Sequence, residues 1–267
     1  MFSNNRLVVT VFIDSHCHLD CIDLEDYENN LSSLMHEVEA NGVEHMLCVC
    51  IDLFEFDKMY DVVKDYSQVS VSAGMHPTHS VGDELSVETI LEFVRRKEVV
   101  AVGETGLDYF YQKDQPEWQK QRFRHHINAA KEVKKPVIVH TRDAGEDTIR
   151  IIKEESARDC GGVIHCFTED WAFAKMALDQ DFYISFSGIT TFKTAEQIRE
   201  VVRKIPADRI LIETDSPYLA PVPKRGKQNQ PGYVKYVAEC IANERGMAIE
   251  EVAEISRNNY YDFLNRR

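Results

Sequence analysis

Short apolar segments rich in β-branched residues recur along the chain and alternate with longer stretches of mixed polarity. The segments occupy residues 10–13, 46–50, 69–73, 99–102, 136–139, 162–164, 182–185 and 210–212. Strands of a parallel sheet are covered on both faces, so they read as nearly continuous apolar runs of this kind. The pattern therefore predicts eight parallel strands along the chain.

The stretches between these segments have the spacing of amphipathic helices. The stretch before Gly42 carries apolar side chains at positions i, i+3, i+4 and i+7, and this glycine stands where a helix stop is expected. Ser86 precedes a second periodic stretch, Pro116 opens a long one, and Thr194 with Gln197 has the spacing of a capping box. Further helices are expected at 145–156, 170–178, 194–204, 234–240 and 250–264.

This alternation predicts an α/β fold, a (β/α)8 TIM barrel in which helices surround a ring of strands. An open, doubly wound sheet is the alternative that the pattern leaves. Its dinucleotide-binding form has no support, because Gly-x-Gly-x-x-Gly does not follow the first segment. No linker-like tract divides the chain, so residues 1–267 are expected to form a single domain. Residues 221–232 predict a long loop at the end of the barrel where active sites lie.

Composition and charge narrow the class of protein. The chain has 267 residues, 43% of them hydrophobic, which is typical of a globular protein, and its formal net charge is −14. Such a charge argues against a protein that coats nucleic acid by bulk electrostatics. A nuclease whose local field comes from bound cations is compatible with it.

Cysteine usage and apolar run lengths bear on location. The seven cysteines form no Cys-x-x-Cys pair and are odd in number, which favours free thiols in a reducing compartment. The apolar runs are shorter than the roughly 20 residues of a membrane span, and residues 1–10 lack the pattern of a secretory signal. The sequence therefore predicts a cytoplasmic protein that does not insert in a membrane.

Candidate chemistry begins at the end of the first apolar segment, with His16 and His18. In extended backbone, side chains at i and i+2 point the same way, so both imidazoles can aim at one point. Neutral imidazole is a ligand for zinc, manganese, iron or cobalt. The pair alone is also compatible with two polar residues in a turn.

Later segments end in ligand-type residues as well, namely Glu104, His140, His165 and Asp215. Each alone could be a hydrogen-bonded structural residue or a helix cap. In a barrel, however, the carboxyl ends of all strands ring one mouth, so residues about 200 positions apart converge there. Burying these carboxylates together without a cation would be costly. The joint pattern predicts a metal site.

The sequence resembles the TatD family of metal-dependent deoxyribonucleases, within the amidohydrolase-like barrel superfamily. The resemblance rests on DSHCHLD at 14–20, GMHP at 74–77, GETGLDY at 103–109, PVIVH at 136–140, HCF at 165–167 and ETDSPYLAP at 213–221. Residues 225–231, RGKQNQP, are similar to the family's Arg-Gly-Lys-x-Asn-Glu-Pro loop, with Gln230 in place of the glutamate. These motifs run from the first strand to the last loop and cover nearly the whole chain.

The resemblance implies two divalent metal ions, zinc, manganese or magnesium, and a full set of ligands. The implied ligands are His16, His18, Glu104, His140, His165 and Asp215. Glu104 would bridge the ions, and two ions can activate a shared water and clamp a phosphodiester. Asp215 is the expected general base, so Glu104 and Asp215 are the expected catalytic residues.

Three further residues near the expected mouth are candidates for substrate binding: His76, Arg142 and Arg225. Imidazole and guanidinium groups there could hold flanking phosphates. For the lysines beside Arg225, Lys224 and Lys227, a solvated surface loop is an equally good interpretation. Tyr109, Phe110 and Tyr111 could stack on a base, although packing is the more common role of aromatic residues after a strand.

The sequence therefore predicts a divalent-metal-dependent hydrolase of DNA phosphodiester bonds, acting from a strand end, with DNA as its substrate and no obligate protein partner. A first alternative is a metal-dependent amide or ester hydrolase of the same barrel superfamily, for example one acting on an aminoacyl-tRNA ester. A second is a non-catalytic binding protein on a decayed barrel, against which the intact ligand set argues.

Overall fold

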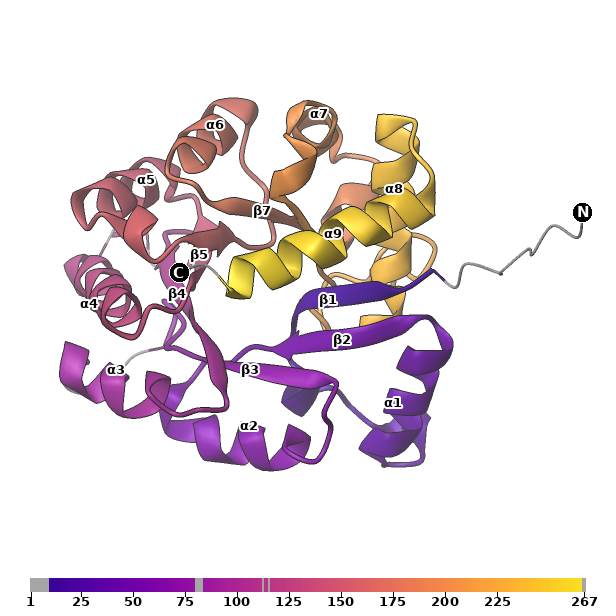
Figure 1. The fold of residues 1–267 in the computed structure, drawn as a ribbon, viewed down its shortest axis with the longest axis horizontal. Helices are drawn as coiled ribbons and strands as arrows, with labels where there is room; N and C mark the ends of the chain where they lie inside the picture. The colour runs from indigo at the N-terminus through magenta and orange to yellow at the C-terminus, as the bar shows by residue number, and fades with distance from the viewer. Residues whose placement is uncertain (1–9, 80–83, 112, 115, 266–267) are drawn as a thin grey trace, which may run out of the picture.

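The computed structural model describes residues 10–79, 84–111, 113–114 and 116–265. They form one eight-stranded parallel sheet whose strands follow one another in chain order, with helices outside the ring (Figure 1). The predicted (β/α)8 barrel is confirmed, and the open doubly wound sheet is excluded because its strand order would reverse. Residues 1–9, on which the prediction of no secretory signal rests, lie outside the described residues.

The strands are β1 Phe12–Cys17, β2 Val43–Cys48, β3 Val69–Ala73, β4 Val99–Asp108, β5 Val137–Arg142, β6 Gly162–Ile164, β7 Tyr183–Phe186 and β8 Ile210–Ile212. The α-helices are α1 Leu31–Ala40, α2 Phe56–Val63, α3 Val87–Val94, α4 Glu117–Val133, α5 Gly145–Glu154, α6 Trp171–Asp179, α7 Glu196–Lys204, α8 Val234–Arg245 and α9 Ile249–Leu264. Short 3-10 turns complete the connections at Leu19–Cys21, Glu25–Tyr27, Leu53–Glu55, Ala157–Asp159, Gly188–Thr191, Ala207–Arg209 and Pro231–Tyr233.

Local signals in the sequence explain most of these boundaries. The Ser86 hydroxyl accepts a hydrogen bond from the Thr89 N–H and caps α3, as predicted. Gly42, just after the C-cap of α1, has φ +84°, a conformation that glycine adopts without strain. The predicted capping box at Thr194 is wrong, because α7 begins at Glu196 behind Ala195, whose methyl group cannot accept a hydrogen bond.

The ring closes where the two ends of the barrel sequence meet. Cys17, the last residue of β1, forms a parallel bridge with Ser216 in the segment that follows β8. The backbone N–H of Asp215 donates to the His16 carbonyl at 2.9 Å, and the His18 N–H donates to the Ser216 carbonyl at 2.8 Å. These bonds place both sequence-predicted ligand segments side by side at the carboxyl end of the barrel.

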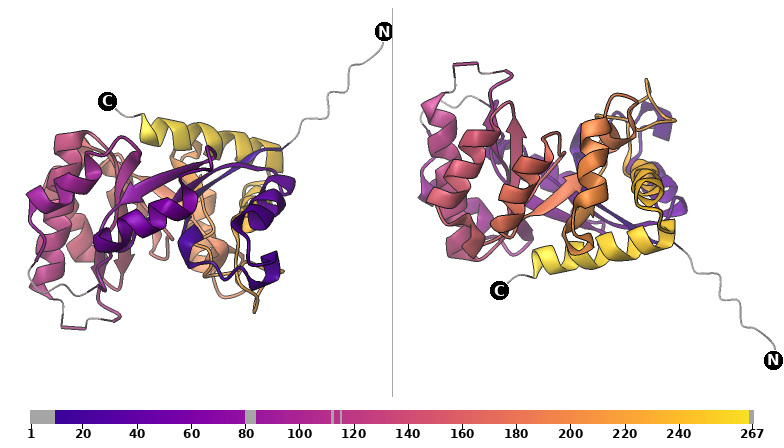
Figure 2. Two further views of the ribbon diagram at one scale, coloured as in Figure 1. Left: turned by 90° about the horizontal axis from the view of Figure 1, so that it is seen from below. Right: turned by 90° about the horizontal axis from the view of Figure 1, so that it is seen from above.

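The amino end of the barrel is closed by α9, which lies along that end in both edge-on views (Figure 2). The Asn259 amide of this helix donates to the carbonyl of Ile210, the first residue of β8. Tyr260 and Phe263 of α9 pack with the inward-facing apolar side chains of the strands and are fully buried. Among the described residues, no helix combines the length and apolar character needed to span a membrane.

Candidate metal centre

A cavity of about 910 Å³ opens at the carboxyl ends of the strands. Ligand-type side chains from β4, β5 and the segments after β1, β3, β6 and β8 line it, together with aromatic and apolar residues of the loops. The site residues among the lining are His18, His76, Glu104, His140, Arg142, His165 and Asp215. The carboxyl ends of the strands therefore converge on one mouth, as predicted.

Glu104 of β4 lies at the centre of the cluster, and each of its oxygens faces different histidines. Oε2 is 3.4 Å from His16 Nε2 and 3.9 Å from His18 Nε2. Oε1 is 2.8 Å from His165 Nε2 and 3.0 Å from His140 Nδ1. The carboxylate is almost completely buried, with 3% of its side chain exposed. This one side chain therefore joins two groups of imidazoles.

The histidines of β1 and its end point their Nε2 atoms at a common region. The two Nε2 atoms of His16 and His18 are 3.3 Å apart. His18 Nδ1 lies 2.9 Å from the Val49 carbonyl, which can only accept, so this nitrogen carries the proton and donates. In neutral His18 the lone pair is therefore at Nε2, on the side of Glu104 and Asp215.

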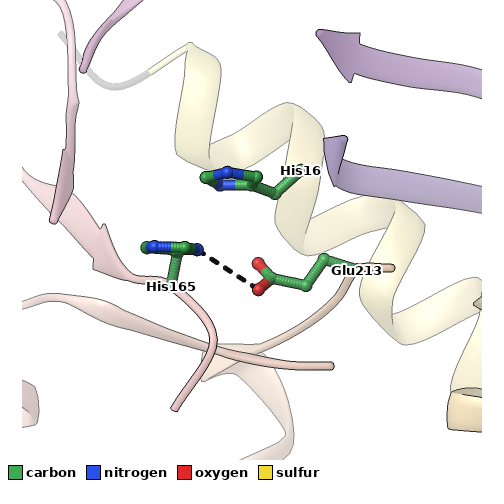
Figure 3. Close-up of side chains that lie close together, drawn as sticks. All are labelled: His16, His165 and Glu213. Atoms are coloured by element: carbon green, nitrogen blue, oxygen red, sulfur yellow. Dashed lines mark ion pairs between the residues drawn. The ribbon is translucent and has the colours of Figure 1, made fainter. Parts of the chain in front are cut away.

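The histidine within β5 and the histidine that follows β6 are each backed by a second carboxylate. His140 lies between two carboxylates, with Nε2 3.2 Å from Asp108 Oδ2 and Nδ1 3.0 Å from Glu104 Oε1. With the proton of the neutral ring held at Nε2 by Asp108, Nδ1 could offer its lone pair to a cation beside Glu104. His165 Nδ1 lies 3.4 Å from Glu213 Oε1, the ion pair drawn in Figure 3. The ring of His16 stacks on that of His165, with centroids 4.0 Å apart. Carboxylates behind ligand histidines fix the tautomer and raise the basicity of the ring.

This donor set fits divalent cations. Groups that could share an ion, with ligand atoms within 4.8 Å of one another, are His16, His18 and Glu104; His76, Glu104 and His140; and His16, His165 and Glu213. Within the described part of the chain, the buried His16 Nδ1 and both ring nitrogens of His165 have no hydrogen-bond partner of good geometry. Imidazole nitrogens that face carboxylate oxygens without a well-formed hydrogen bond are suited to a shared cation.

The pKa values in the cluster are set by the contacts between buried carboxylates and the imidazoles around them. Burial alone would raise the pKa of Glu104, but His165 and His76 outweigh burial and hold this pKa well below its usual range. Burial also opposes the charged form of His18, yet Asp215 beside it raises the pKa of His18 to about 9. Ligation of a cation therefore requires protons to leave some of the imidazoles.

Asp215 stands after β8 with φ +56° and an almost buried side chain. Its Oδ1 is 3.3 Å from His18 Nε2 and 3.7 Å from His16 Nε2. Burial alone would raise its pKa, but the hydrogen bond with His18 outweighs burial and lowers it, so the group is an ionised carboxylate near neutral pH. An ionised carboxylate beside the imidazoles, lining the cavity, can act as ligand and as proton acceptor.

His76 lies within the cluster but differs from the other imidazoles. The Thr78 N–H donates to His76 Nδ1 at 3.2 Å, so neutral His76 carries its proton at Nε2. That nitrogen is 3.3 Å from Glu104 Oε1, and burial lowers the pKa of the ring. His76 therefore presents a hydrogen-bond donor to the cavity, which suits the predicted role in substrate binding.

Helix α4 holds the segment that carries His76. The fully buried Arg122 guanidinium donates to the carbonyls of His76 and His79, at 3.2 and 2.6 Å, and pairs with Glu84. Gln119 donates to the Pro77 carbonyl. One turn further along α4, His126 Nε2 accepts the backbone N–H of Met75 at 3.2 Å. The segment after β3 is thus fixed through its backbone.

The two predicted basic residues lie in different places. Arg142, the last residue of β5, lines the cavity. Arg225 stacks on the Phe192 ring, with Cζ 4.0 Å from its centroid, and is not among the residues that line the cavity in the described ranges. Sequence reasoning did not single out Asp108 and Glu213 behind the histidines, or His79 and Tyr218 in the cavity wall. Asp108 and Glu213 lie close in sequence to the predicted ligands Glu104 and Asp215, and this proximity could have indicated them.

The comparisons with known proteins agree with this geometry. The family model of TatD related DNases matches residues 13–265. The chain belongs to the TatD family. It is 48% identical, over 93% of each chain, to a relative in Escherichia coli strain K12 named as an uncharacterized metal-dependent hydrolase, YcfH.

Two further TatD-family proteins place the chain among solved and named relatives. A protein of Escherichia fergusonii named 3′-5′ ssDNA/RNA exonuclease TatD is 33% identical over 78% of this chain and 82% of its own. The crystal structure of YjjV, a TatD homologue from Escherichia coli K12, superposes with a TM-score of 0.87 at 26% identity and covers 97% of this chain and 100% of its own. The protein is thus a metal-dependent hydrolase on a TIM barrel.

Proposed function

We propose that this TatD-family hydrolase cleaves phosphodiester bonds of DNA from a strand end, using two divalent ions. The observation that carries the proposal is Glu104, whose two oxygens face separate groups of histidines inside one open cavity. We assign His16, His18 and Asp215 to one ion and His140 and His165 to the other, with Glu104 shared. The name of the Escherichia fergusonii relative, an exonuclease of single-stranded DNA and RNA, supports the substrate class.

Divalent ions at this centre would supply Lewis-acid activation of water and neutralisation of phosphate charge. The side chains of the protein do the rest. Asp215, ionised and beside the cavity, accepts the proton of the attacking water. His76 Nε2–H donates to a non-bridging phosphate oxygen. Asp108 and Glu213 lie behind His140 and His165, where their charge favours a proton on the ring nitrogen that faces away from the ion.

The test uses protein stripped with a chelator and reloaded with zinc, manganese or magnesium. Labelled single-stranded DNA, RNA and a panel of simple esters and amides are the substrates, with the label at either end of the oligonucleotide. We expect stepwise shortening of DNA from one end, only with metal. Hydrolysis confined to the ester or amide panel would overturn the nuclease assignment and favour the other hydrolase class.

The role of Asp215 is tested against that of a pure ligand. Asp215→Asn keeps one coordinating oxygen but loses the charge and the basicity, so we expect it to retain much of its metal and lose roughly 10²- to 10⁴-fold in turnover. His16→Ala should lose metal and activity together, with partial recovery at high metal concentration. Asp208→Asn, at an exposed carboxylate before β8, is the matched control. Full metal with near-normal turnover in Asp215→Asn would remove Asp215 as the base.

A further inference from the structure

Three large aromatic side chains stand exposed at the mouth of the cavity. Phe110 is 44% exposed, Tyr111 is 65% exposed and Tyr218 is 53% exposed. Tyr111 and Tyr218 line the same cavity as Glu104 and Asp215. Contact between an aromatic ring and water costs free energy, and this cost is removed when the ring is covered. Exposed rings around a polar cavity therefore mark a surface that a ligand covers.

Phe110, Tyr111 and Arg142 form one wall of the mouth. The Arg142 guanidinium lies over the Phe110 ring at 3.8 Å from the centroid and 5.2 Å from that of Tyr111. The backbone beneath is anchored, because the Tyr111 N–H donates to Asp108 Oδ1 at 2.9 Å and the Tyr109 N–H donates to the Arg142 carbonyl. The wall is therefore a pair of rings and a guanidinium on a fixed base.

Tyr218 forms a second wall on the far side. It follows β8, whereas Tyr111 follows β4 and Arg142 ends β5, and in a ring of eight strands β8 stands opposite β4. Its ring meets His18 edge-on, with centroids 6.2 Å apart. Its backbone is also fixed, because the Asn229 amide donates to the carbonyls of Tyr218 and Thr214. The metal-ligand cluster lies between the two walls.

Charge provides little of the binding surface here. Among the described residues that line the cavity, Arg142 is the one arginine or lysine, and the whole chain carries a net charge of −14. Apart from the phosphate that reacts, the phosphates of a bound oligonucleotide therefore have one permanently charged side chain in the cavity lining, Arg142, to pair with. Affinity for an oligonucleotide has to come from contacts with its bases.

We propose that the two walls are base-stacking sites that hold the unpaired nucleotides on either side of the scissile phosphate. The inference rests on the proposed nuclease function and adds to it the residues that select the substrate. Stacking needs the flat face of a base on an exposed ring, and in a duplex these faces are covered by the neighbouring pairs. The enzyme thus selects strand ends with unpaired bases, without reading their sequence.

The experiment pairs ring-removing variants with oligonucleotides that lack single bases. Tyr111→Ala and Tyr218→Ala are compared with Tyr111→Phe and Tyr218→Phe, which keep the ring. Tyr261→Ala, at a partly exposed tyrosine on α9 at the other end of the barrel, is the matched control. Each variant is assayed on a single-stranded oligonucleotide and on versions with one abasic residue near the digested end. KM and kcat are measured separately, and metal content is measured alongside.

We expect each alanine variant to raise KM roughly 5- to 100-fold with kcat within a few fold and full metal content. The phenylalanine variants and Tyr261→Ala should behave as wild type. An abasic residue at the matched position should raise KM for wild type by a similar factor and abolish the effect of the alanine substitution, as expected for two partners of one contact. The salt dependence of KM should also be shallow, with log KM rising against log salt concentration with a slope of about 0.7 for one phosphate contact.

The outcomes separate this inference from the function beneath it. Alanine variants with unchanged KM, or equal effects on intact and abasic oligonucleotides, would overturn the stacking sites while leaving the nuclease activity in place. Loss of kcat together with metal would also overturn them, because Tyr218 would then act through His18. Failure of the wild-type protein to cleave any oligonucleotide would overturn the proposed function itself.

Discussion

The two ends of the barrel bury side chains equally well but with opposite chemistry. At the amino end, Tyr260 and Phe263 of α9 are fully buried among apolar side chains of the strands. At the carboxyl end, His16 and Glu104 are buried to the same degree, at 0% and 3% exposure. Burial of apolar groups stabilises the fold, whereas burial of charge costs free energy unless a partner compensates it.

The stability of the fold thus depends mainly on the amino end of the barrel, and its chemistry depends on the carboxyl end. The apolar end holds the strands in register. The polar end can then keep imidazoles and carboxylates close together in a state that a cation completes. If this division holds, substitutions at the two ends should affect different observables, and the following experiments test it in order of expected effect.

The largest effect is expected for Glu104→Gln. The substitution removes the charge that faces both histidine groups, so turnover should fall at least about 10³-fold and metal content should drop. Added manganese should raise the unfolding temperature of wild type but not of this variant, because ligands stabilise only the state that binds them. Elemental analysis, turnover and thermal unfolding check this. Wild-type metal content in Glu104→Gln would contradict the central role of this carboxylate.

The next largest effect is expected for Phe263→Ala at the opposite end. Its ring is fully buried and meets Tyr183 edge-on, with centroids 5.9 Å apart. Truncating a buried phenylalanine costs about 3–5 kcal/mol of unfolding free energy. Urea unfolding measures the loss, with the more exposed Tyr261→Ala as control. Turnover per folded molecule should stay at the wild-type value, and a large loss there would show that the two ends are coupled.

A smaller effect is expected for Asp108→Asn. The asparagine still accepts the Tyr111 N–H but removes the negative charge behind His140. Metal affinity should fall roughly 10- to 100-fold with little change in stability. Metal titration against a competing chelator provides the measurement. Asp147→Asn, at a carboxylate that pairs with Lys120 and Arg150 instead, should bind metal normally; equal losses in both variants would point to a general charge effect.

The smallest effect near neutral pH is a pH dependence of stability from His126, which lies beneath the mouth and contributes only as the pH falls below about 6.5. Burial lowers the pKa of His126 to about 3, while the unfolded chain has the ordinary value near 6.5. Below pH 6.5 the unfolded state therefore binds a proton that the folded state does not, and stability falls with decreasing pH by at most about 1.4 kcal/mol per unit until the pH reaches about 3. Urea unfolding across this range with chelator present, in wild type and His126→Asn, isolates the contribution. Identical slopes in the two proteins would contradict it.

The barrel and the ligand positions could be predicted because both depend on short-range pattern. Parallel strands must be apolar, and their ends share one mouth, so His16, His140 and His165 could be grouped without knowing any distance. The boundaries were harder to predict. β4 continues to Asp108, beyond the apolar run that ends at residue 102, because residues 105–108 pair with residues 139–142 of β5.

The details that orient the site could not be predicted from pattern. That Asp108 backs His140 and Glu213 backs His165 depends on side-chain direction across neighbouring strands. Helix α2 was not predicted, although Phe56, Met59, Tyr60 and Val63 have helical spacing, because it is only eight residues long and follows directly on a 3-10 turn. Arg225 was grouped with the mouth because of its charge, whereas the structure stacks it on Phe192. Charge alone does not say where a loop folds back.

The hydrogen bonds that join β1 to the segment after β8 have a consequence for the order of events in folding. Asp14 accepts the Thr214 N–H at 2.8 Å across 200 positions of sequence, and the same closure brings Asp215 to His18. Contacts so distant along the chain form late, since the intervening loop must first be ordered. Residues 10–20 are synthesised long before Asp215, so the complete centre cannot form in a nascent chain that ends before Asp215. Binding of metal at the complete centre therefore indicates that β8 has packed against β1.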